Sequence, residues 1–199
     1  IGSGAGHFIK ACEKSNIKVK GYEINRNLVK VAKKNGVKNI FHESPTKINE
    51  IIKNNKSDVV CLISTLEHLE DPNLTLKLIK QSKIKYLYTC IPLFSLSTFI
   101  ENVFPNVYPR QLNASHTHLY TYKSIKYMTK KFKFKILGEW WFGTDISDLY
   151  RSLLLNSNYF DKEYIKYFNK LFGDHIDVLQ NILDKKKLSC EVHLVLKVN

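Results

Sequence analysis

The sequence has few of the features that mark membrane proteins and zinc proteins. No apolar run approaches the ~20 residues that a membrane-spanning helix needs. Its 4 cysteines lie far apart, without a CxxC pair or the Cys/His spacing of a zinc site. Cys61 and Cys90 fall inside apolar runs, where a thiol usually behaves as a small buried side chain. We therefore expect reduced thiols, a cytoplasmic protein without a membrane anchor, and no structural zinc.

Arginine is also scarce, and only Arg26, Arg110 and Arg151 stand among the 31 basic residues. The formal net charge of +13 is of the sign that attracts phosphates. However, the basic residues are mostly lysines spread along the chain, and Lys, Asn and Ile are abundant together, as AT-rich codon usage produces. The composition favours a solvated lysine surface, and nucleic acid or an anionic substrate is the alternative.

The stretch that organises the chain is a glycine-rich turn at its beginning. Gly2, Gly4 and Gly6 form a GxGxG pattern, which lets the backbone bend sharply and approach a ligand closely. An amphipathic run follows and predicts a helix. Residues 19–22 then predict a strand, and Glu23 stands at its end, where a carboxylate can accept hydrogen bonds from a ribose diol. The pattern predicts a site for a nucleoside-containing cofactor, and an ordinary strand-to-helix turn is the alternative.

One position separates two kinds of cofactor. The dinucleotide fingerprint GxGxxG needs a third glycine at position 7, and this sequence has His7 there. His7 therefore disfavours a nicotinamide oxidoreductase. The turn instead resembles motif I of the class I S-adenosylmethionine (SAM)-dependent methyltransferases. The strand and the acid that precede this motif in the family are not in the sequence, so we expect the numbering to start inside a longer protein.

Helical and strand patterns alternate after the turn. The near-continuous apolar run at 58–64 is typical of a parallel strand buried on both faces, and 86–91 predicts the next strand. This alternation predicts a doubly wound α/β fold with ligands at the carboxyl ends of the strands. The resemblance implies a Rossmann-like, mostly parallel seven-stranded sheet whose first strand lies outside the sequence. It also implies that the last strand, at 191–198, inserts antiparallel between the fifth and sixth.

A second resemblance strengthens the first. The run SDVVCLISTLEHLEDP at 57–72 resembles the motif IV region of the same family, in which a strand ends over the cofactor and a LEH tripeptide opens the loop. The likeness extends from Gly2 to about Trp141. It implies SAM as cofactor, with Glu43 or Ser44 as candidates for the adenine amino group. The implied cofactor-binding residues are Gly2, Ser3, Gly4, Gly6, Glu23, Ile24, Glu43, Ser44, Ser64, Thr65 and Leu66.

The pattern changes after Pro92. We expect one domain over residues 1–199, with cap-like insertions at about 93–115 and 143–187. The first insertion is rich in aromatic residues, namely Phe94, Phe99, Phe104 and Tyr108. Around the start of the second, residues 140–151 combine aromatic rings with Asp145, Asp148 and Arg151, which predicts either a strand end packed under a helix or a wall for a sugar or ring substrate.

Three side chains are candidates for proton transfer to or from an acceptor: Glu67, His68 and His118. Glu67 and His68 come directly after the strand that the resemblance places beside the methyl group, and His118 borders the cap. A general base helps to remove the proton of a hydroxyl acceptor. His116 and His118 form an HxH pair, but two histidines do not fill a metal coordination sphere, so no metal is predicted.

We therefore expect a SAM-dependent methyltransferase that acts on a small polar acceptor. The resemblance suggests a sugar or nucleotide-linked sugar of surface-polysaccharide synthesis. An RNA methyltransferase is the alternative that the charge favours, although the sequence has LEHL where an NPPY acceptor motif would stand. A nicotinamide oxidoreductase and a non-catalytic partner subunit with the same fold are the remaining alternatives.

Overall fold

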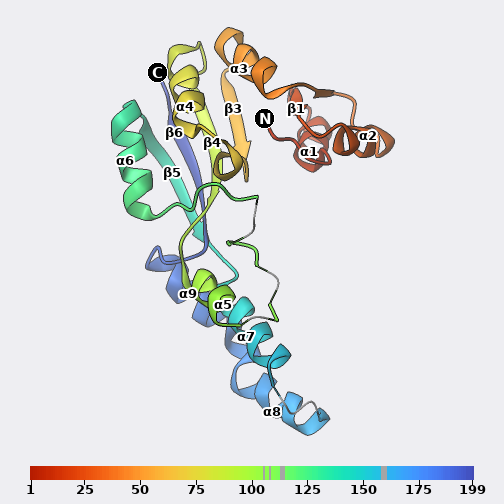
Figure 1. Cartoon of the computed structure of the whole chain (residues 1–199), viewed down its shortest axis with the longest axis vertical. Coiled ribbons are helices and arrows are strands. Elements are labelled where there is room, and N and C mark those ends of the chain that lie inside the picture. The colour runs from red at the N-terminus through yellow and green to blue at the C-terminus, as the bar shows by residue number, and fades with distance from the viewer. Residues whose placement is uncertain (105, 108, 113–114, 158–160) are drawn as a thin grey trace.

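The computed structural model describes residues 1–104, 106–107, 109–112, 115–157 and 161–199. Tyr108 of the predicted aromatic cap lies outside these residues. The described strands are β1 (Gly21–Glu23), β2 (Ile40–His42), β3 (Val59–Ile63), β4 (Tyr86–Pro92), β5 (Lys135–Phe142) and β6 (Glu191–Lys197). Helices alternate with strands through the first half of the chain, so the predicted α/β class is confirmed (Figure 1).

The strands form two sheets. β1 pairs with β2 in parallel, and a four-stranded sheet has the order β3-β4-β6-β5. β3 and β4 are parallel, whereas β6 runs antiparallel to both β4 and β5. This confirms the expected insertion of the last strand between its two predecessors. The seven-stranded sheet that the resemblance implies, with its first strand outside the sequence, is not confirmed, since no hydrogen-bonded pairing joins β1 or β2 to the four-stranded sheet within the described residues.

The helices begin mostly where polar side chains cap them. The described helices are α1 (His7–Lys14), α2 (Arg26–Lys34), α3 (Pro45–Asn54), α4 (Pro72–Gln81), α5 (Leu96–Val103), α6 (Tyr122–Phe132), α7 (Asp145–Leu155), α8 (Lys162–Leu171) and α9 (Ile176–Lys185), with 3-10 turns η1 (Leu66–His68) and η2 (Gly173–His175). Asn25, Ser44 and Asp71 each accept backbone N–H groups at a helix start, which satisfies donors that the helix cannot. None of the described helices has the length and apolar character that crossing a bilayer requires.

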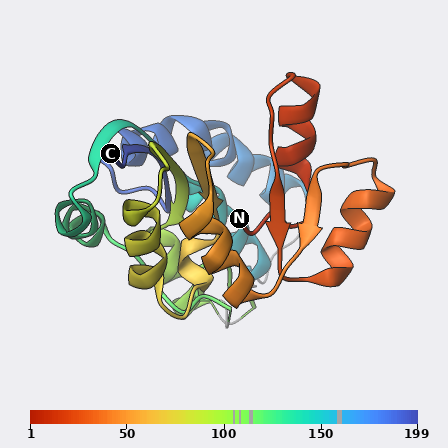
Figure 2. The same ribbon diagram turned by 90° about the horizontal axis from the view of Figure 1, so that it is seen from above.

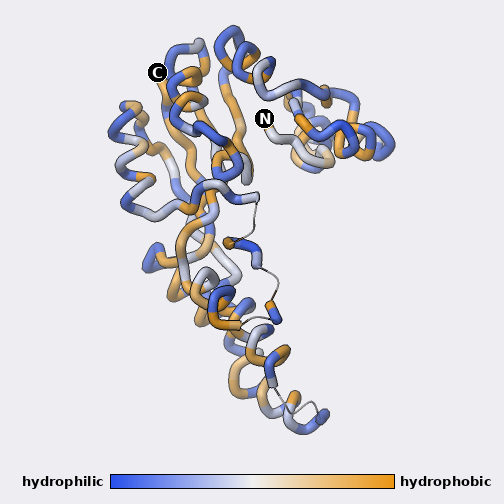
Figure 3. The backbone as a smooth tube through the Cα atoms, viewed as in Figure 1, coloured by the Kyte–Doolittle hydropathy of each residue, from blue (hydrophilic) through white to orange (hydrophobic). Residues whose placement is uncertain are grey.

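The four-stranded sheet buries one face under α3, α4 and α6. Its central side chains, Leu62, Leu87 and Leu194, are fully buried in the main core. Figure 3 shows the matching concentration of apolar residues along β3, β4 and β6. A smaller core lies between α1, α2 and β2 and includes Ile9 and Ala32. Each sheet therefore has its own packed layer.

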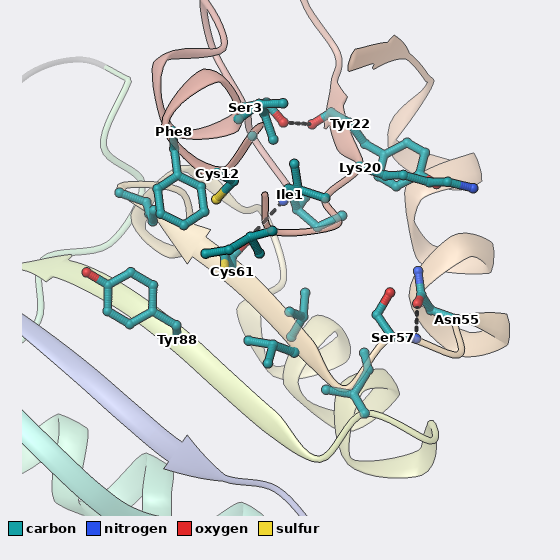
Figure 4. Close-up of a pocket in the computed structure, with 18 of the residues that line it drawn as sticks. Ile1, Ser3, Phe8, Cys12, Lys20, Tyr22, Asn55, Ser57, Cys61 and Tyr88 are labelled. Carbon is teal, nitrogen blue, oxygen red and sulfur yellow. Dashed lines mark hydrogen bonds between the residues drawn. The ribbon is translucent and has the colours of Figure 1, made fainter. Parts of the chain in front are cut away.

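A cavity of about 1010 Å³ lies between the two sheets. It is bordered by the glycine loop on one side and by β3 and Tyr88 on the other (Figure 4). Figure 2 shows the two-stranded sheet of β1 and β2, in red and orange, standing beside the four-stranded sheet. Oγ1 of Thr65, just after β3, lies 3.3 Å from the carbonyl of Ile1, and Ser3 N donates to the carbonyl of Tyr22 in β1 at 3.2 Å. The glycine loop is thus attached both to β1 and to β3.

The remaining helices, α5, α7, α8 and α9, form a separate helical part beyond the carboxyl ends of β3 and β4 (Figure 1). The helical stretch from α8 to α9 is broken at η2. The break has a packing reason. The Tyr150 ring of α7 stacks on Phe168 of α8, at 5.3 Å, and also contacts Phe172, where the chain turns. The turn lets α9 return along α7.

Candidate cofactor and acceptor site

The glycine loop has the backbone geometry that its sequence predicts. Gly2, Gly4 and Gly6 all have positive φ, at +65°, +53° and +79°, a region that favours glycine. A Cβ atom on Gly2 would lie 2.5 Å from Oγ1 of Thr65, and one on Gly6 would lie 3.0 Å from Val37. At Gly4 it would meet nothing within 4 Å. Gly2 and Gly6 therefore permit close packing, whereas Gly4 faces open space.

Glu23 supports this loop from the end of β1. Its side chain is buried and accepts two backbone hydrogen bonds, from Gly4 N at 2.7 Å and from Asn25 N at 2.8 Å. The carboxylate thus lies directly beside the open space at Gly4. Each of its oxygens keeps a further lone pair, so Glu23 is able to accept hydroxyl donors as well.

The hydroxyl groups around the loop are engaged within the protein. Ser3 Oγ donates to the carbonyl of Tyr22 at 3.2 Å (Figure 4). Thr65 Oγ1 approaches the carbonyls of Ile63, at 2.9 Å, and Ile1, at 3.3 Å. These bonds hold the loop against β1 and β3 at once. Ser3 and Thr65 therefore act first as supports of the loop.

The two adenine candidates differ in availability. Ser44 accepts the backbone N–H of Lys47 and caps α3, so its hydroxyl already has a structural task. Glu43 is half-buried and is attached through its backbone N–H to the carbonyl of Glu23, at 3.1 Å. Ile24, which follows Glu23 in the sequence, is 55% exposed and offers an apolar surface. Of the pair, Glu43 has the side chain with fewer structural obligations.

Two residues after β3, Ser64 and Leu66, are predicted to bind the cofactor. Ser64 has φ of +45°, which is unusual for a residue other than glycine, and marks a sharp turn. Leu66, a predicted cofactor-binding residue, has its side chain fully buried in the main core. Leu66 can therefore reach a cofactor only through its backbone.

Glu67 and His68 lie on η1, and the loop before α6 is fastened to that turn. The backbone N–H groups of Thr117 and His118 both donate to the carbonyl of Glu67, at 2.8 and 3.2 Å. Thr117 Oγ1 lies within hydrogen-bond distance of the carbonyls of Glu67 and Leu69 as well. The structure thus brings all three predicted catalytic residues to one place.

A fourth residue, His116, lies closer to this group than the sequence suggested. Its ring is 4.8 Å from the ring of His68, centroid to centroid. Glu67, His68 and His116 each offer one ligand atom, and these atoms lie within 4.8 Å of one another. The HxH spacing was the only sequence signal, and it did not indicate that His116, and not His118, would face His68.

Glu67 is unusual among the buried acids of the chain. Its side chain is 1% exposed, and Oε2 has no hydrogen-bond partner within the described residues. Burial raises the pKa of this carboxyl group, while its own backbone N–H and nearby His68 act in the opposite direction. The hydroxyl of Tyr120 is also buried and unpartnered within the described part of the chain, and burial raises its pKa too, with the charge of Glu67 adding to the effect.

A second polar cluster lies nearby on β4 and β6. Cys90 and Glu191 are in contact, and His193 Nε2 lies 3.6 Å from Oε1 of Glu191. Tyr88 bonds to Nδ1 of His193 at 2.5 Å. Burial raises the pKa of the Cys90 thiol, and the bond to Glu191 adds to that increase. This cluster is internally satisfied, unlike the one at Glu67.

The acids of the second predicted insertion are structural. Asp145 is fully buried and accepts hydrogen bonds from Ser95, Ser97 and the backbone N–H of Cys190. Asp148 is paired with Arg110 and Arg151. These carboxylates join α5, α7 and the start of β6, and are not free to bind a sugar. The interpretation as a strand end packed under a helix therefore holds, and the sugar wall is wrong for these two acids.

Comparison with known proteins agrees with this geometry. The family model described as a methyltransferase domain matches residues 1–139. The chain belongs to this family. No curated protein matches the chain in sequence. The family and its fold confirm the predicted class I SAM-dependent methyltransferase, an enzyme with S-adenosyl-L-methionine as cofactor.

Several solved structures share the fold at low identity. A SAM-dependent methyltransferase from Archaeoglobus fulgidus is 19% identical, with a TM-score of 0.61 over 98% of this chain and 83% of that one. A putative sarcosine dimethylglycine methyltransferase from Galdieria sulphuraria is 11% identical, with a TM-score of 0.60 over 100% and 76%. Magnesium protoporphyrin IX methyltransferase from Synechocystis, solved with bound SAH, is 14% identical, with a TM-score of 0.54 over 69% and 64%. Their differing names leave the acceptor of this methyltransferase open.

Proposed function

We propose that this methyltransferase transfers a methyl group from SAM to an oxygen or nitrogen atom of a small polar acceptor. A sugar or nucleotide-linked sugar is the first acceptor class to test. The observation that carries the proposal is the open space at Gly4, which lies beside the braced carboxylate of Glu23. At such a place a cofactor's ribose would meet Glu23, and Ile24 and Glu43 would flank its base.

SAM supplies an activated methyl group on a positively charged sulfur. With SAM bound, the acceptor atom would displace the methyl group, and the electron pair of the broken carbon–sulfur bond would stay on sulfur. The acceptor's proton must pass to a base. The protein's main contribution is to align the two groups and exclude water.

His118 is our candidate for that base, with Glu67 and His68 positioning the acceptor. Thr117 Oγ1 lies 2.9 Å from Nδ1 of His118 and can direct its own proton to a backbone carbonyl. A hydroxyl that donates elsewhere accepts from Nδ1–H, which leaves the lone pair of His118 on Nε2. Nε2 is then the atom available to receive a proton.

The helical part made of α5, α7, α8 and α9 would act as the cap predicted from the sequence. It lies beyond the carboxyl ends of β3 and β4, where ligands bind in open α/β folds (Figure 1). The internal pairing of Asp145 and Asp148 would make it a rigid wall for the acceptor. A cytoplasmic location stays a prediction.

The cofactor position is tested by two matched glycine variants. Gly4 and Gly36 both have positive φ, and an added Cβ would meet nothing within 4 Å at either position. Each change to alanine should therefore cost a similar amount of stability, roughly 1–2 kcal/mol. Only Gly4→Ala places a methyl group in the proposed cofactor space, and calorimetry should show at least tenfold weaker SAM binding for that variant alone. Equal SAM affinity in both variants would remove the cofactor from Gly4.

The acceptor class is tested by the release of S-adenosylhomocysteine with panels of nucleotide sugars, small amines and RNA. Turnover with nucleotide sugars supports the proposal. Turnover with RNA alone would establish the alternative that the charge of +13 favours. Calorimetry with NAD in place of SAM provides a further control, because NAD binding without SAM binding would contradict the proposed use of the site.

A further inference from the structure

We propose that Glu67, His68 and His116 bind a divalent transition-metal ion, such as Zn²⁺ or Mn²⁺, beside the acceptor position. The three side chains come from two segments, η1 and the loop before α6. Their ligand atoms lie within 4.8 Å of one another. Metal–ligand bonds of about 2.0–2.2 Å place neighbouring ligands about 3–3.5 Å apart, so small side-chain rotations would complete the arrangement.

The Nε2 atoms of His68 and His116 are both free to bind a metal ion. Nδ1 of His68 lies 2.8 Å from the carbonyl of Ser115, and Nδ1 of His116 lies 3.1 Å from the carbonyl of Gln111. A carbonyl can only accept, so each Nδ1 carries the proton and each Nε2 keeps its lone pair. Metal-binding histidines are typically oriented in this way by a carbonyl on the second nitrogen.

The third ligand is the carboxylate of Glu67, whose hydrogen bonding is incomplete within the described residues. Oε1 of Glu67 lies 3.8 Å from Nε2 of His68, and Oε2 has no partner in the described part of the chain, although the side chain is 1% exposed. An unpaired buried carboxylate is costly, and a cation would offset that cost.

The donor set selects the ion. Two imidazole nitrogens and one carboxylate oxygen suit first-row transition metals better than Mg²⁺ or Ca²⁺, which prefer oxygen ligands. Three protein ligands leave positions open for an acceptor or water. Besides His68, the carboxylate of Glu191 is the ionisable group that acts on Glu67, and Glu67 in turn acts on the hydroxyl of Tyr120.

The role of the ion, unlike its binding, rests on the proposed function. An acceptor hydroxyl bound to a divalent ion loses its proton more readily, because the metal stabilises the oxyanion. The proton would pass to His118, and the acceptor oxygen would be oriented by the metal. The ion is neither oxidised nor reduced.

The binding test uses Co²⁺ alone, without SAM or acceptor. We expect one equivalent of Co²⁺ to produce visible absorption bands with the unchanged protein, and Zn²⁺ to displace it. His116→Ala and Glu67→Gln should each weaken binding at least tenfold. His118→Ala, two residues from His116, is the matched control and should keep the bands. Circular dichroism and melting curves check that every variant is folded.

Three results would overturn the inference. The first is the absence of stoichiometric Co²⁺ binding. The second is Co²⁺ binding that is equal in the unchanged protein and in the His116→Ala and Glu67→Gln variants. The third is an infrared signature of protonated Glu67 at neutral pH without metal binding. The proposed function is judged separately, by SAM calorimetry in the presence of a chelator. Full methyl transfer in chelator would reject the role of the ion, and failure of SAM binding in a protein that still binds Co²⁺ would reject only the proposed function.

Discussion

The glycine loop and the η1 turn each place a buried glutamate at the carboxyl end of a strand, and the two glutamates are treated differently. Glu23, at the end of β1, is 6% exposed and receives two backbone N–H groups on its carboxylate. Glu67, after β3, is 1% exposed and has one oxygen without a partner within the described residues. The carboxylate of Glu23 holds the backbone of the glycine loop, whereas the carboxylate of Glu67 is available to bind a ligand.

The helical part contains a third buried acid, Asp145, whose carboxylate is more completely hydrogen-bonded than those of Glu23 and Glu67. Asp145 is fully buried and has donors around both oxygens, from α5, from α9 and from the residue before β6. Buried acids in this protein therefore range from fully satisfied to unsatisfied. Satisfaction, more than burial, distinguishes a structural acid from a functional candidate. Variants at these positions test that distinction.

Asp145→Ala should have the largest effect. It leaves the buried Ser95 hydroxyl and the Cys190 N–H without their acceptor, so we expect a loss of about 3–5 kcal/mol in the free energy of unfolding. Urea denaturation measures it, and exposed Asp174, as Asp174→Ala, is the control. A loss below about 1 kcal/mol would contradict the structural role of Asp145.

Glu23→Gln should come next. The new amide group would face one of the two backbone donors, Gly4 N or Asn25 N, so stability should fall by about 1–3 kcal/mol. SAM affinity should fall about tenfold to a hundredfold, which calorimetry measures. Glu50→Gln, on the exposed surface of α3, serves as the control. Unchanged SAM affinity would separate Glu23 from the cofactor site.

Glu67→Gln should change stability least among the three acids, by less than about 1 kcal/mol, because it removes a carboxylate that is not fully paired. The new amide can also donate to Nε2 of His68. Methyl transfer should nevertheless fall at least tenfold. A stability loss as large as that of Asp145→Ala would show that Glu67 is structural after all, and urea denaturation beside a turnover assay decides between these outcomes.

A pH experiment on β6 should show the smallest effect. Burial lowers the pKa of His193, although Glu191 acts against this, so the unfolded chain takes up a proton at a higher pH than the folded one. Stability should therefore fall as the pH drops from 7 through the ordinary histidine value of about 6.5. In His193→Gln that fall should be shallower. Equal slopes in the unchanged protein and in His193→Gln would show that His193 does not contribute to the pH dependence of stability.

Much of the fold followed from local sequence signals. The glycine pattern predicted a turn that the structure builds with three positive φ angles, and the apolar run before Ser64 predicted β3. Such features depend on a few neighbouring residues, which the sequence displays directly. The family resemblance alone then placed the last strand correctly between β4 and β5.

The parts that could not be predicted depend on distant contacts. His116 and His118 are two residues apart, and only the packing of their loop on η1 decides that the ring of His116 meets His68. Likewise, Asp145 could not be classified until its partners on α5 and α9 were known. The break at η2 depends on the contacts of Tyr150 with Phe168, which stacks on it, and with Phe172.

The position of β6 has a consequence for biosynthesis. β5 pairs only with β6 among the described strands, and β6 is the last of them to be translated. While the ribosome makes the residues between the two, β5 has no neighbour and its apolar side chains remain open to chaperones or to other chains. The sheet closes when Val192, Leu194 and Leu196 emerge from the exit tunnel and enter the core. Nascent chains stalled before residue 191 should therefore remain protease-sensitive, whatever the state of the glycine loop.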